Sequence, residues 1–173
     1  MDPEKIGARP LRPQYESIIS AIPGAKVIDN GQEFLPLYAK AEHFGLPPER
    51  IMKTVYFEDG EIVVAAVLPI TERVDTGALA AEAGAKKLRL ARESSLPKGQ
   101  YPGSLGPWIA GEDDWERVSK VLFIEGDYGI TDWAYPGDPG RSVHADYCQV
   151  FNALSGARPD KYAFAEISMP LSA

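Results

Sequence analysis

The chain has 173 residues, of which 45% are hydrophobic and 25% are charged, and these values are ordinary for one globular domain with its own core. Its formal net charge of −7 disfavours broad, non-specific nucleic-acid binding. One cysteine excludes an internal disulfide, and two histidines argue against a dedicated zinc site. Because neither a long apolar run nor a signal-peptide pattern occurs, we expect a single cytoplasmic domain over residues 1–173, without a cofactor or a membrane partner.

The first quarter of the chain predicts an arm, two helices and a short strand. Residues 1–13 hold three prolines and no periodicity, which indicates an extended or disordered N-terminal arm. Apolar residues at helical spacing predict a helix over residues 13–21, and residues 25–29 follow as a short strand. A second helix is expected from about Pro36 to Phe44, with Gly45 as its C-terminal stop.

The clearest pattern is a β-hairpin formed by residues 51–57 and 61–68. The connecting residues Glu58-Asp59-Gly60 are typical of a turn. The second strand is apolar on both faces, so it is expected at the centre of a sheet. Asp75 or Thr76 is predicted to cap a helix that ends at Gly84.

Further short elements follow, and strands outnumber helices. Strands are predicted at residues 86–90, 118–124, 129–134, 142–147 and 162–167, a helical turn at 92–96 and a helix near 147–154. Residues 111–116 are expected to form an acidic connection and residues 136–140 a tight loop. Because the order is not a regular βαβ alternation, the pattern favours an α+β fold with a mixed, partly closed sheet.

Lys53 interrupts the apolar run of the first hairpin strand, Ile51-Met52-Lys53-Thr54-Val55-Tyr56-Phe57. Burying an ammonium group costs on the order of several kcal/mol of folding free energy unless the group is paired or faces a cavity. A lysine at this position is therefore a candidate functional residue.

A glycine-rich loop is the second candidate. Gly99, Gly103 and Pro107 recur at intervals of four residues, and small residues at such spacing let backbone N–H groups approach a ligand closely. Those donors can stabilise an oxyanion. The spacing alone is equally typical of an ordinary surface loop.

The common catalytic motifs are missing from the sequence. There is no dinucleotide or phosphate-binding glycine motif, no G-x-S-x-G and no H-E-x-x-H. Cys148 lies in an apolar helical pattern and is interpreted as packing. A basic cluster, Lys86, Lys87, Arg89, Arg92 and Lys98, is opposed only by Glu93, and it is interpreted either as a solvated face or as a patch for a phosphate backbone.

Taken together, four segments resemble the YbaK family, also called the prolyl-tRNA synthetase associated or aminoacyl-tRNA editing domain. They are Met52-Lys53-Thr54, the apolar strand 62–68, Ala83-Gly84-Ala85-Lys86-Lys87-Leu88 and Gly99-x3-Gly103-x3-Pro107, and the resemblance runs from about Leu37 to Leu154. It implies a six- to seven-stranded, barrel-like mixed sheet with flanking helices. It also implies trans-editing, the hydrolysis of the ester that links a wrong amino acid to tRNA.

The resemblance also assigns roles to residues. Lys53 matches the functional lysine of the family and would contact the terminal nucleotide, whereas Gly103 and Pro107 match a G-x-x-x-P loop that would position the aminoacyl carbonyl. The family uses no metal and no covalent nucleophile, since a ribose hydroxyl of the tRNA helps to activate water. The remaining expected substrate and tRNA contacts are Thr54, Gly99, Ser104, Gly106, Lys86, Lys87 and Arg89.

Substrate choice is the least determined feature. His144 follows a Gly-rich loop, as in similar alanine-editing members, and would select a small side chain, although a strand histidine also has a structural interpretation. Ser104 stands where many members have glycine, and Gly106 where serine is common. The expected substrate is alanyl- or cysteinyl-tRNA for proline, with a synthetase as a further partner. The alternative is a non-catalytic module that binds an amino acid, a nucleotide or a tRNA end.

Overall fold

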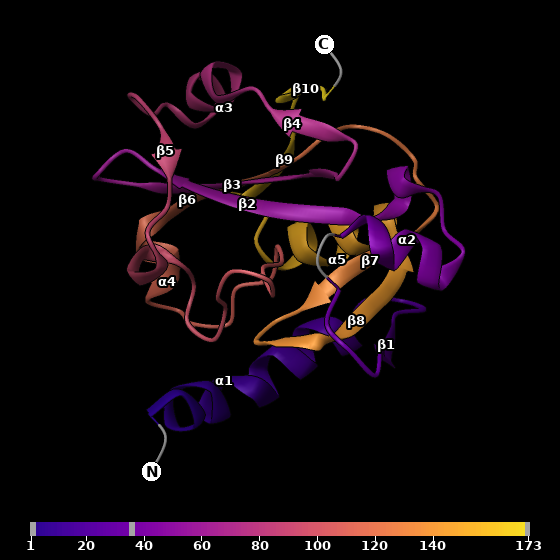
Figure 1. The fold of residues 1–173 in the computed structure, drawn as a ribbon. Coiled ribbons are helices and arrows are strands. Elements are labelled where there is room, and N and C mark those ends of the chain that lie inside the picture. Colours follow the sequence, from indigo (N-terminus) through magenta and orange to yellow (C-terminus); the bar gives the residue numbers. More distant parts are fainter. Residues whose placement is uncertain (1–2, 35–36, 172–173) are drawn as a thin grey trace.

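A computed structural model describes residues 3–34 and 37–171, with side chains from residue 12 onward apart from that gap. Its elements, shown in Figure 1, are α1 (Pro3–Ser20), β1 (Lys26–Asp29), α2 (Tyr38–Phe44), η1 (Pro48–Arg50), β2 (Met52–Glu58), β3 (Val63–Pro69), β4 (Glu72–Val74), α3 (Thr76–Ala83), β5 (Arg89–Leu90), η2 (Glu93–Ser95), α4 (Asp114–Arg117), β6 (Val118–Phe123), β7 (Ile130–Tyr135), β8 (Asp138–Asp146), α5 (Tyr147–Ala157), β9 (Tyr162–Phe164) and β10 (Ser168–Pro170).

A five-stranded sheet runs across the middle of the molecule in the order β5-β2-β3-β6-β9 (Figure 1). The predicted hairpin is confirmed, because β2 pairs antiparallel with β3 and Lys53 lies opposite Leu68. β6 joins parallel to β3, and β9 joins parallel to β6. All residues of β3 are buried, as its apolar pattern on both faces predicted.

The two faces of this sheet contribute to two hydrophobic clusters. Successive side chains of a strand point to opposite faces, so Tyr56 joins a larger cluster that contains Trp108 and Trp133. Phe57 joins a second cluster, which also includes Leu79 of α3. Lys53, four residues before Phe57, therefore projects toward the face of the second cluster.

Smaller sheets complete the fold. β1, β8 and β7 form a three-stranded antiparallel sheet, and β10 pairs with β4. A bridge between Ile51 and Asp132 connects the start of β2 to β7. The α+β class, the mixed sheet and the flanking helices are confirmed, and the strands divide among three sheets. Among the described residues, no helix has the length and apolarity to cross a lipid bilayer.

The beginning of the chain corrects one expectation. Instead of an extended arm, α1 begins at Pro3 and continues to Ser20; residues 1–2 lie outside the described part. Tyr15, Ile19 and Ile22 are buried in the larger cluster, which anchors the C-terminal half of this segment. Pro3 lies in the first turn, where proline costs no helical hydrogen bond, whereas Pro10 and Pro13 each remove one. The helix nevertheless continues through both internal prolines.

Most other local signals are confirmed within small shifts. Asp75 caps α3 by accepting a hydrogen bond from the backbone of Ala78, and Gly45 and Gly84 end their helices in the left-handed conformation. The strand expected at residues 86–90 is reduced to β5, and α4 overlaps the second half of the expected acidic connection. The expected helix start at Pro36 lies outside the described residues. β4 and β10 were not predicted.

Candidate functional site

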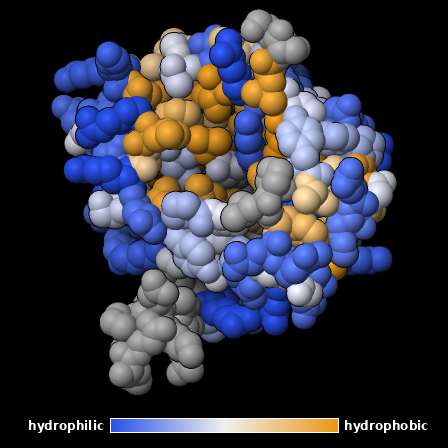
Figure 2. All heavy atoms as spheres, viewed as in Figure 1, coloured by the Kyte–Doolittle hydropathy of each residue, from blue (hydrophilic) through white to orange (hydrophobic). Residues whose placement is uncertain are grey.

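The glycine loop, residues 97–110, connects η2 to the region before α4 and lies below β2 in Figure 1. Tyrosines from the five-stranded sheet hold its second half: the Tyr56 hydroxyl donates to the carbonyl of Gly106 at 2.7 Å, and the Tyr162 hydroxyl donates to that of Pro107 at 2.6 Å. Burial raises the pKa of both tyrosines, so their hydroxyls remain protonated donors. Figure 2 shows hydrophobic residues around a hollow on this face of the molecule.

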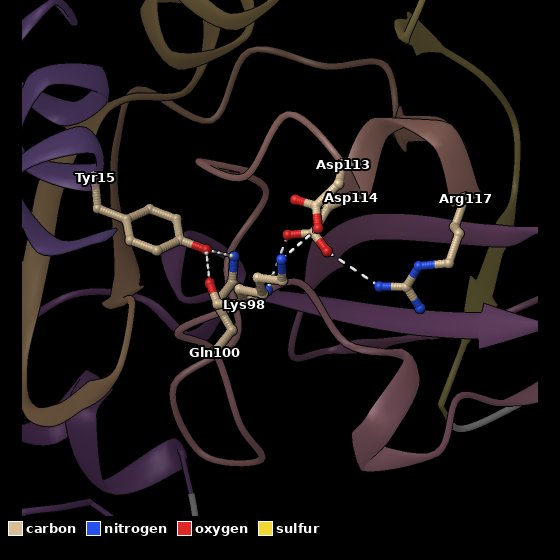
Figure 3. Close-up of polar contacts among 6 residues, drawn as sticks. All are labelled: Tyr15, Lys98, Gln100, Asp113, Asp114 and Arg117. Atoms are coloured by element: carbon tan, nitrogen blue, oxygen red, sulfur yellow. Dashed lines mark hydrogen bonds and ion pairs between the residues drawn. The ribbon is translucent and has the colours of Figure 1, made fainter. Parts of the chain in front are cut away.

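Gln100 closes the loop on itself from inside. Its side-chain oxygen accepts from the backbone N–H of Gly106 at 2.8 Å, and its amide nitrogen donates to the carbonyl of Trp108 and to the hydroxyl of Tyr15. Tyr15 in turn donates to the carbonyl of Lys98 at 2.5 Å, and burial raises its pKa to about 12. Figure 3 shows how α1 thereby reaches the start of the loop.

A buried aspartate holds the start of the loop from the opposite side. Asp114 accepts the backbone N–H of Lys98 at 3.0 Å and pairs with Arg117 at 3.0 Å, as Figure 3 shows. The ammonium of Lys98 contacts Asp113. Both sides of the loop entrance are therefore bonded, which predicts a backbone of low mobility.

Removing the side-chain contacts of Gln100 is expected to destabilise and loosen the loop. Gln100→Leu leaves the Gly106 N–H and the Trp108 carbonyl buried without this partner, and each such loss costs about 1–3 kcal/mol. We expect a lower urea midpoint and faster hydrogen exchange of the loop amides. Gln149→Leu, on the exposed side of α5, is the matched control. Unchanged amide exchange in Gln100→Leu would contradict a clasp.

Ser104 and Gly137 attach the loop to the turn between β7 and β8. The Ser104 hydroxyl donates to the carbonyl of Tyr101 at 3.1 Å and accepts from the N–H of Gly137 at 3.2 Å. Gly137 has φ +74°, and a Cβ there would lie 2.6 Å from the carbonyl oxygen of Gly99. The hydroxyl of Ser104, which was expected to contact the substrate, thus forms hydrogen bonds within the protein.

Gly103 opens into a small cleft with a volume of about 130 Å³. Its walls come from the segment before α2, from α2, from the loop and from the β7–β8 hairpin, and are formed by Glu33, Phe34, Leu37, Lys40, Tyr101, Pro102, Gly103, Ala134, Pro139 and Arg141. The walls are mainly apolar, with polar groups at a few positions, as is typical of sites for small ligands.

A buried charged network borders this cleft. Asp132 of β7 is fully buried; its Oδ1 lies 2.6 Å from the Nζ of Lys40, and its Oδ2 lies 2.8 Å from the Nε2 of His144. Asp132 and His144 are opposite each other on β7 and β8. Lys40 and Phe44 lie one turn apart on α2, and the Phe44 ring meets the imidazole edge-on at a centroid distance of 4.5 Å. Lys40 offsets the charge of a carboxylate that would otherwise be costly to bury, although the 2.6 Å contact is an ion pair and not a well-aligned hydrogen bond.

Lys53 lies apart from these groups. It is half-buried, burial lowers its pKa, and the nearby charge of Glu72 acts in the opposite direction. It is not among the residues that line the cleft at Gly103. The backbone of Ile51, two residues earlier, bridges to Asp132, but no contact joins Lys53 itself to the network within the described residues. Thr54 is buried on the other face, and its hydroxyl has no partner among the described residues.

Comparison with known proteins identifies the family. A model of the aminoacyl-tRNA editing domain matches residues 37–123, half of the chain. The chain belongs to this family. The match includes Lys53 and the whole Gly99–Pro107 loop, and it ends before β7 and β8, which carry Asp132 and His144.

Solved structures share the fold of this editing domain. A protein proposed as a trans-editing enzyme for prolyl tRNA synthetase is 19% identical, with 98% of this chain and 99% of that chain covered and a TM-score of 0.68. A hypothetical protein is 18% identical (90% and 99% covered, TM-score 0.68), as is a scaffold with a computationally grafted epitope (99% and 100%, TM-score 0.71). No curated protein matched.

The basic cluster of the editing domain is exposed and largely paired. Lys86 lies 3.6 Å from Glu61, and Arg89 and Arg92 lie 3.4 and 3.2 Å from Glu58. No ion pair involves Lys87 within the described part of the chain. The Lys86–Glu61 pair is exposed on both sides and contributes little to stability, whereas Glu58, the partner of Arg89 and Arg92, is buried.

Through Glu58, the basic cluster contributes to the stability of the fold, and this contribution depends on pH. The Ser95 hydroxyl, the Arg92 backbone N–H at 2.8 Å and the guanidinium groups of Arg92 and Arg89 hold its pKa below the ordinary value of 4.5. The ionised form therefore stabilises the fold above that value, and the contribution is lost as pH falls through the lower folded pKa. We expect Glu58→Gln to lower the free energy of unfolding at pH 7 by about 1–2 kcal/mol and to flatten its fall with acid. Denaturant titrations from pH 7 to 3 measure this, with the exposed Glu61→Gln as control; an unchanged acid slope would contradict it.

Residues that sequence reasoning missed are Lys40, Gln100, Asp132 and Tyr15. Lys40 and Asp132 are charged and yet almost fully buried. As for Lys53, a charged residue within an apolar pattern was the signal in the sequence that could have identified them. Their partners come from distant elements, which local patterns do not reveal. Within the described residues, no three His, Cys, Asp or Glu side chains gather as potential metal ligands.

Proposed function

We propose that this editing domain is a trans-editing deacylase that hydrolyses the ester of mischarged tRNA. Its support is the Gly99–Pro107 loop, which Gln100, Tyr56 and Tyr162 hold in place and which opens into the cleft at Gly103. Held backbone N–H groups stabilise developing negative charge on a carbonyl oxygen without reorganising during the reaction. The proposed substrates are alanyl- and cysteinyl-tRNA for proline, since the cleft is small.

In the proposed mechanism, the loop at Gly103 positions the aminoacyl carbonyl, and a ribose hydroxyl of the terminal adenosine helps water to attack it. The ester C–O bond then breaks, which releases the amino acid and the tRNA hydroxyl. Lys53 anchors the terminal nucleotide through its charge. Lys86, Lys87 and Arg89 contact the acceptor-end backbone, and a synthetase supplies further tRNA affinity. Positioning and fixed dipoles each contribute several kcal/mol, roughly 3–10 in favourable cases, so no protein nucleophile is needed.

The decisive experiment offers the purified protein tRNA for proline charged with alanine, cysteine or serine, and with proline as the cognate control. We expect hydrolysis of the alanyl or cysteinyl ester at least tenfold faster than that of the prolyl ester. Survival of every ester would refute the proposal. Binding of a non-hydrolysable aminoacyl-adenosine without turnover of any ester would instead establish the alternative, a non-catalytic binding module.

A further inference from the structure

The buried network of Lys40, Asp132 and His144 has no role in the steps above. Asp132 uses one carboxylate oxygen for each partner, at 2.6 Å to Lys40 and 2.8 Å to His144. The side chains of Lys40 and Asp132 are 6% and 0% exposed, whereas that of His144 retains 15%. The ion pair of Lys40 and Asp132 is thus buried behind the imidazole of His144, which is the most exposed member of the network.

This arrangement determines which ring nitrogen of His144 carries the proton. An ionised carboxylate accepts hydrogen bonds but cannot donate them. Nε2 must therefore carry a hydrogen, and Nδ1 is the nitrogen left for a further partner. The ammonium of Lys40, 2.6 Å from the other carboxylate oxygen, supplies the opposite charge that a buried carboxylate needs.

The network also fixes where the imidazole lies. Phe44 holds the ring edge-on at 4.5 Å, and Phe44 packs in turn against Phe34, at a centroid distance of 6.2 Å. Phe34 and Lys40 both line the cleft at Gly103. Lys40 and Phe34, which contact the two partners of His144, therefore belong to one wall of the proposed substrate cleft, while Asp132, Phe44 and His144 lie behind that wall.

We propose that Asp132 is a positioning residue that, with Lys40, holds His144 as its Nε2–H tautomer beside the cleft and thereby determines which aminoacyl esters are hydrolysed. This inference rests on the proposed function for its effect on substrates. The tautomer itself is independent of any activity, so the two parts are tested separately.

Asp132→Asn in the full chain tests both parts. The ammonium of Lys40 only donates, so the single amide oxygen turns toward it and the amide NH₂ faces His144. The imidazole must then accept at Nε2 and carry its proton on Nδ1, as when an amide replaces the aspartate of a serine-protease triad. We expect ¹⁵N spectra of histidine-labelled protein to show this change of tautomer, with His43→Gln used to assign the second histidine. The ratio of kcat/KM for alanyl and cysteinyl esters on one tRNA is expected to change at least tenfold.

In Asp132→Asn the buried ammonium of Lys40 loses its counter-charge, which can destabilise the fold. The double variant Lys40→Met/Asp132→Asn avoids this defect because neither buried side chain is charged. Without the ammonium, the amide oxygen is free to accept from His144, so we expect the Nε2–H tautomer to return and the substrate ratio with it. Asp160→Asn, an exposed aspartate, controls for the loss of one charge.

Three outcomes overturn the inference. An unchanged tautomer in Asp132→Asn shows that Asp132 does not position the ring, and a changed tautomer with an unchanged substrate ratio shows that the ring does not select substrates. A double variant that regains the tautomer but not the ratio assigns selection to Lys40 instead. If the wild-type protein hydrolyses no ester, the proposed function fails, while the spectra still decide whether Asp132 positions His144.

Discussion

Lys53→Met is expected to reduce deacylation at least 100-fold, which corresponds to about 2.7 kcal/mol of transition-state stabilisation, without destabilising the fold. Burial lowers the pKa of Lys53, and the charge of Glu72 offsets only part of that effect. A methionine of similar length removes the charge and keeps the apolar stem. Loss of activity from a protein that is equally or more stable is the signature of a residue kept for function.

The cost of burying Lys53 also depends on pH. The folded pKa of Lys53 lies below its ordinary value of 10.5, so the folded state binds this proton less tightly than the unfolded state. The charged lysine therefore costs stability at neutral pH, and the cost diminishes as pH rises through the folded pKa. The stability advantage of Lys53→Met is expected to be largest near pH 7 and smaller near pH 10, as measured by denaturant unfolding.

Lys53→Arg separates charge from proton transfer. Arginine keeps a positive charge but does not lose its proton in proteins, so an anchoring cation predicts activity within about tenfold of wild type, a range of roughly 1.4 kcal/mol. Loss of activity equal to that of Lys53→Met would point to proton transfer instead. Lys120→Met, at a half-buried lysine whose ammonium donates to the backbone carbonyl of Asp160, is the control. Full activity of Lys53→Met would remove Lys53 from the site.

Gly106→Ala is expected to lower the free energy of unfolding by about 1–3 kcal/mol, the usual cost of forcing an extra group into a packed core. An added Cβ would lie 2.3 Å from Nε1 and 2.7 Å from Cε2 of Trp108. Trp108 is fully buried and packs against Trp133 at a centroid distance of 5.8 Å, so it has little room to move. The displacement passes directly to the loop, and we expect deacylation to fall with stability.

Two variants make this prediction sharp. Gly156→Ala, in α5 with open space around the new Cβ, is expected to be neutral or to stabilise by up to about 1 kcal/mol. Trp108→Phe removes the indole atoms that the Cβ meets, so it is expected to be less harmful in combination with Gly106→Ala than additivity predicts. Thermal unfolding of the wild type, of Gly106→Ala, of Trp108→Phe and of the double variant measures the coupling free energy between the two positions. Strict additivity would show that the indole is not the obstacle.

The departures of the glycine loop from its family pattern now have a physical explanation. Serine is common at the position of Gly106, but here the indole of Trp108 occupies the space of a side chain. At position 104, serine replaces the frequent glycine and bonds to the turn at Gly137. The serine adds a hydrogen bond between the loop and the next turn, the glycine leaves room for the indole, and neither change removes the G-x-x-x-P spacing of Gly103 and Pro107.

What the sequence by itself determined was local: the β2–β3 hairpin, the central position of β3, the caps at Asp75, Gly45 and Gly84, and the candidates Lys53 and Gly103. Each depends on side-chain alternation or on the conformational freedom of residues close in the chain. The tertiary structure alone decided that α1 starts at Pro3, that the strands divide among three sheets, and that Gln100 clasps the loop. It also decided that Lys40, Asp132 and His144 form one buried network. These features depend on which distant groups satisfy a buried charge or hydrogen bond, and that choice is made by packing and not by local pattern.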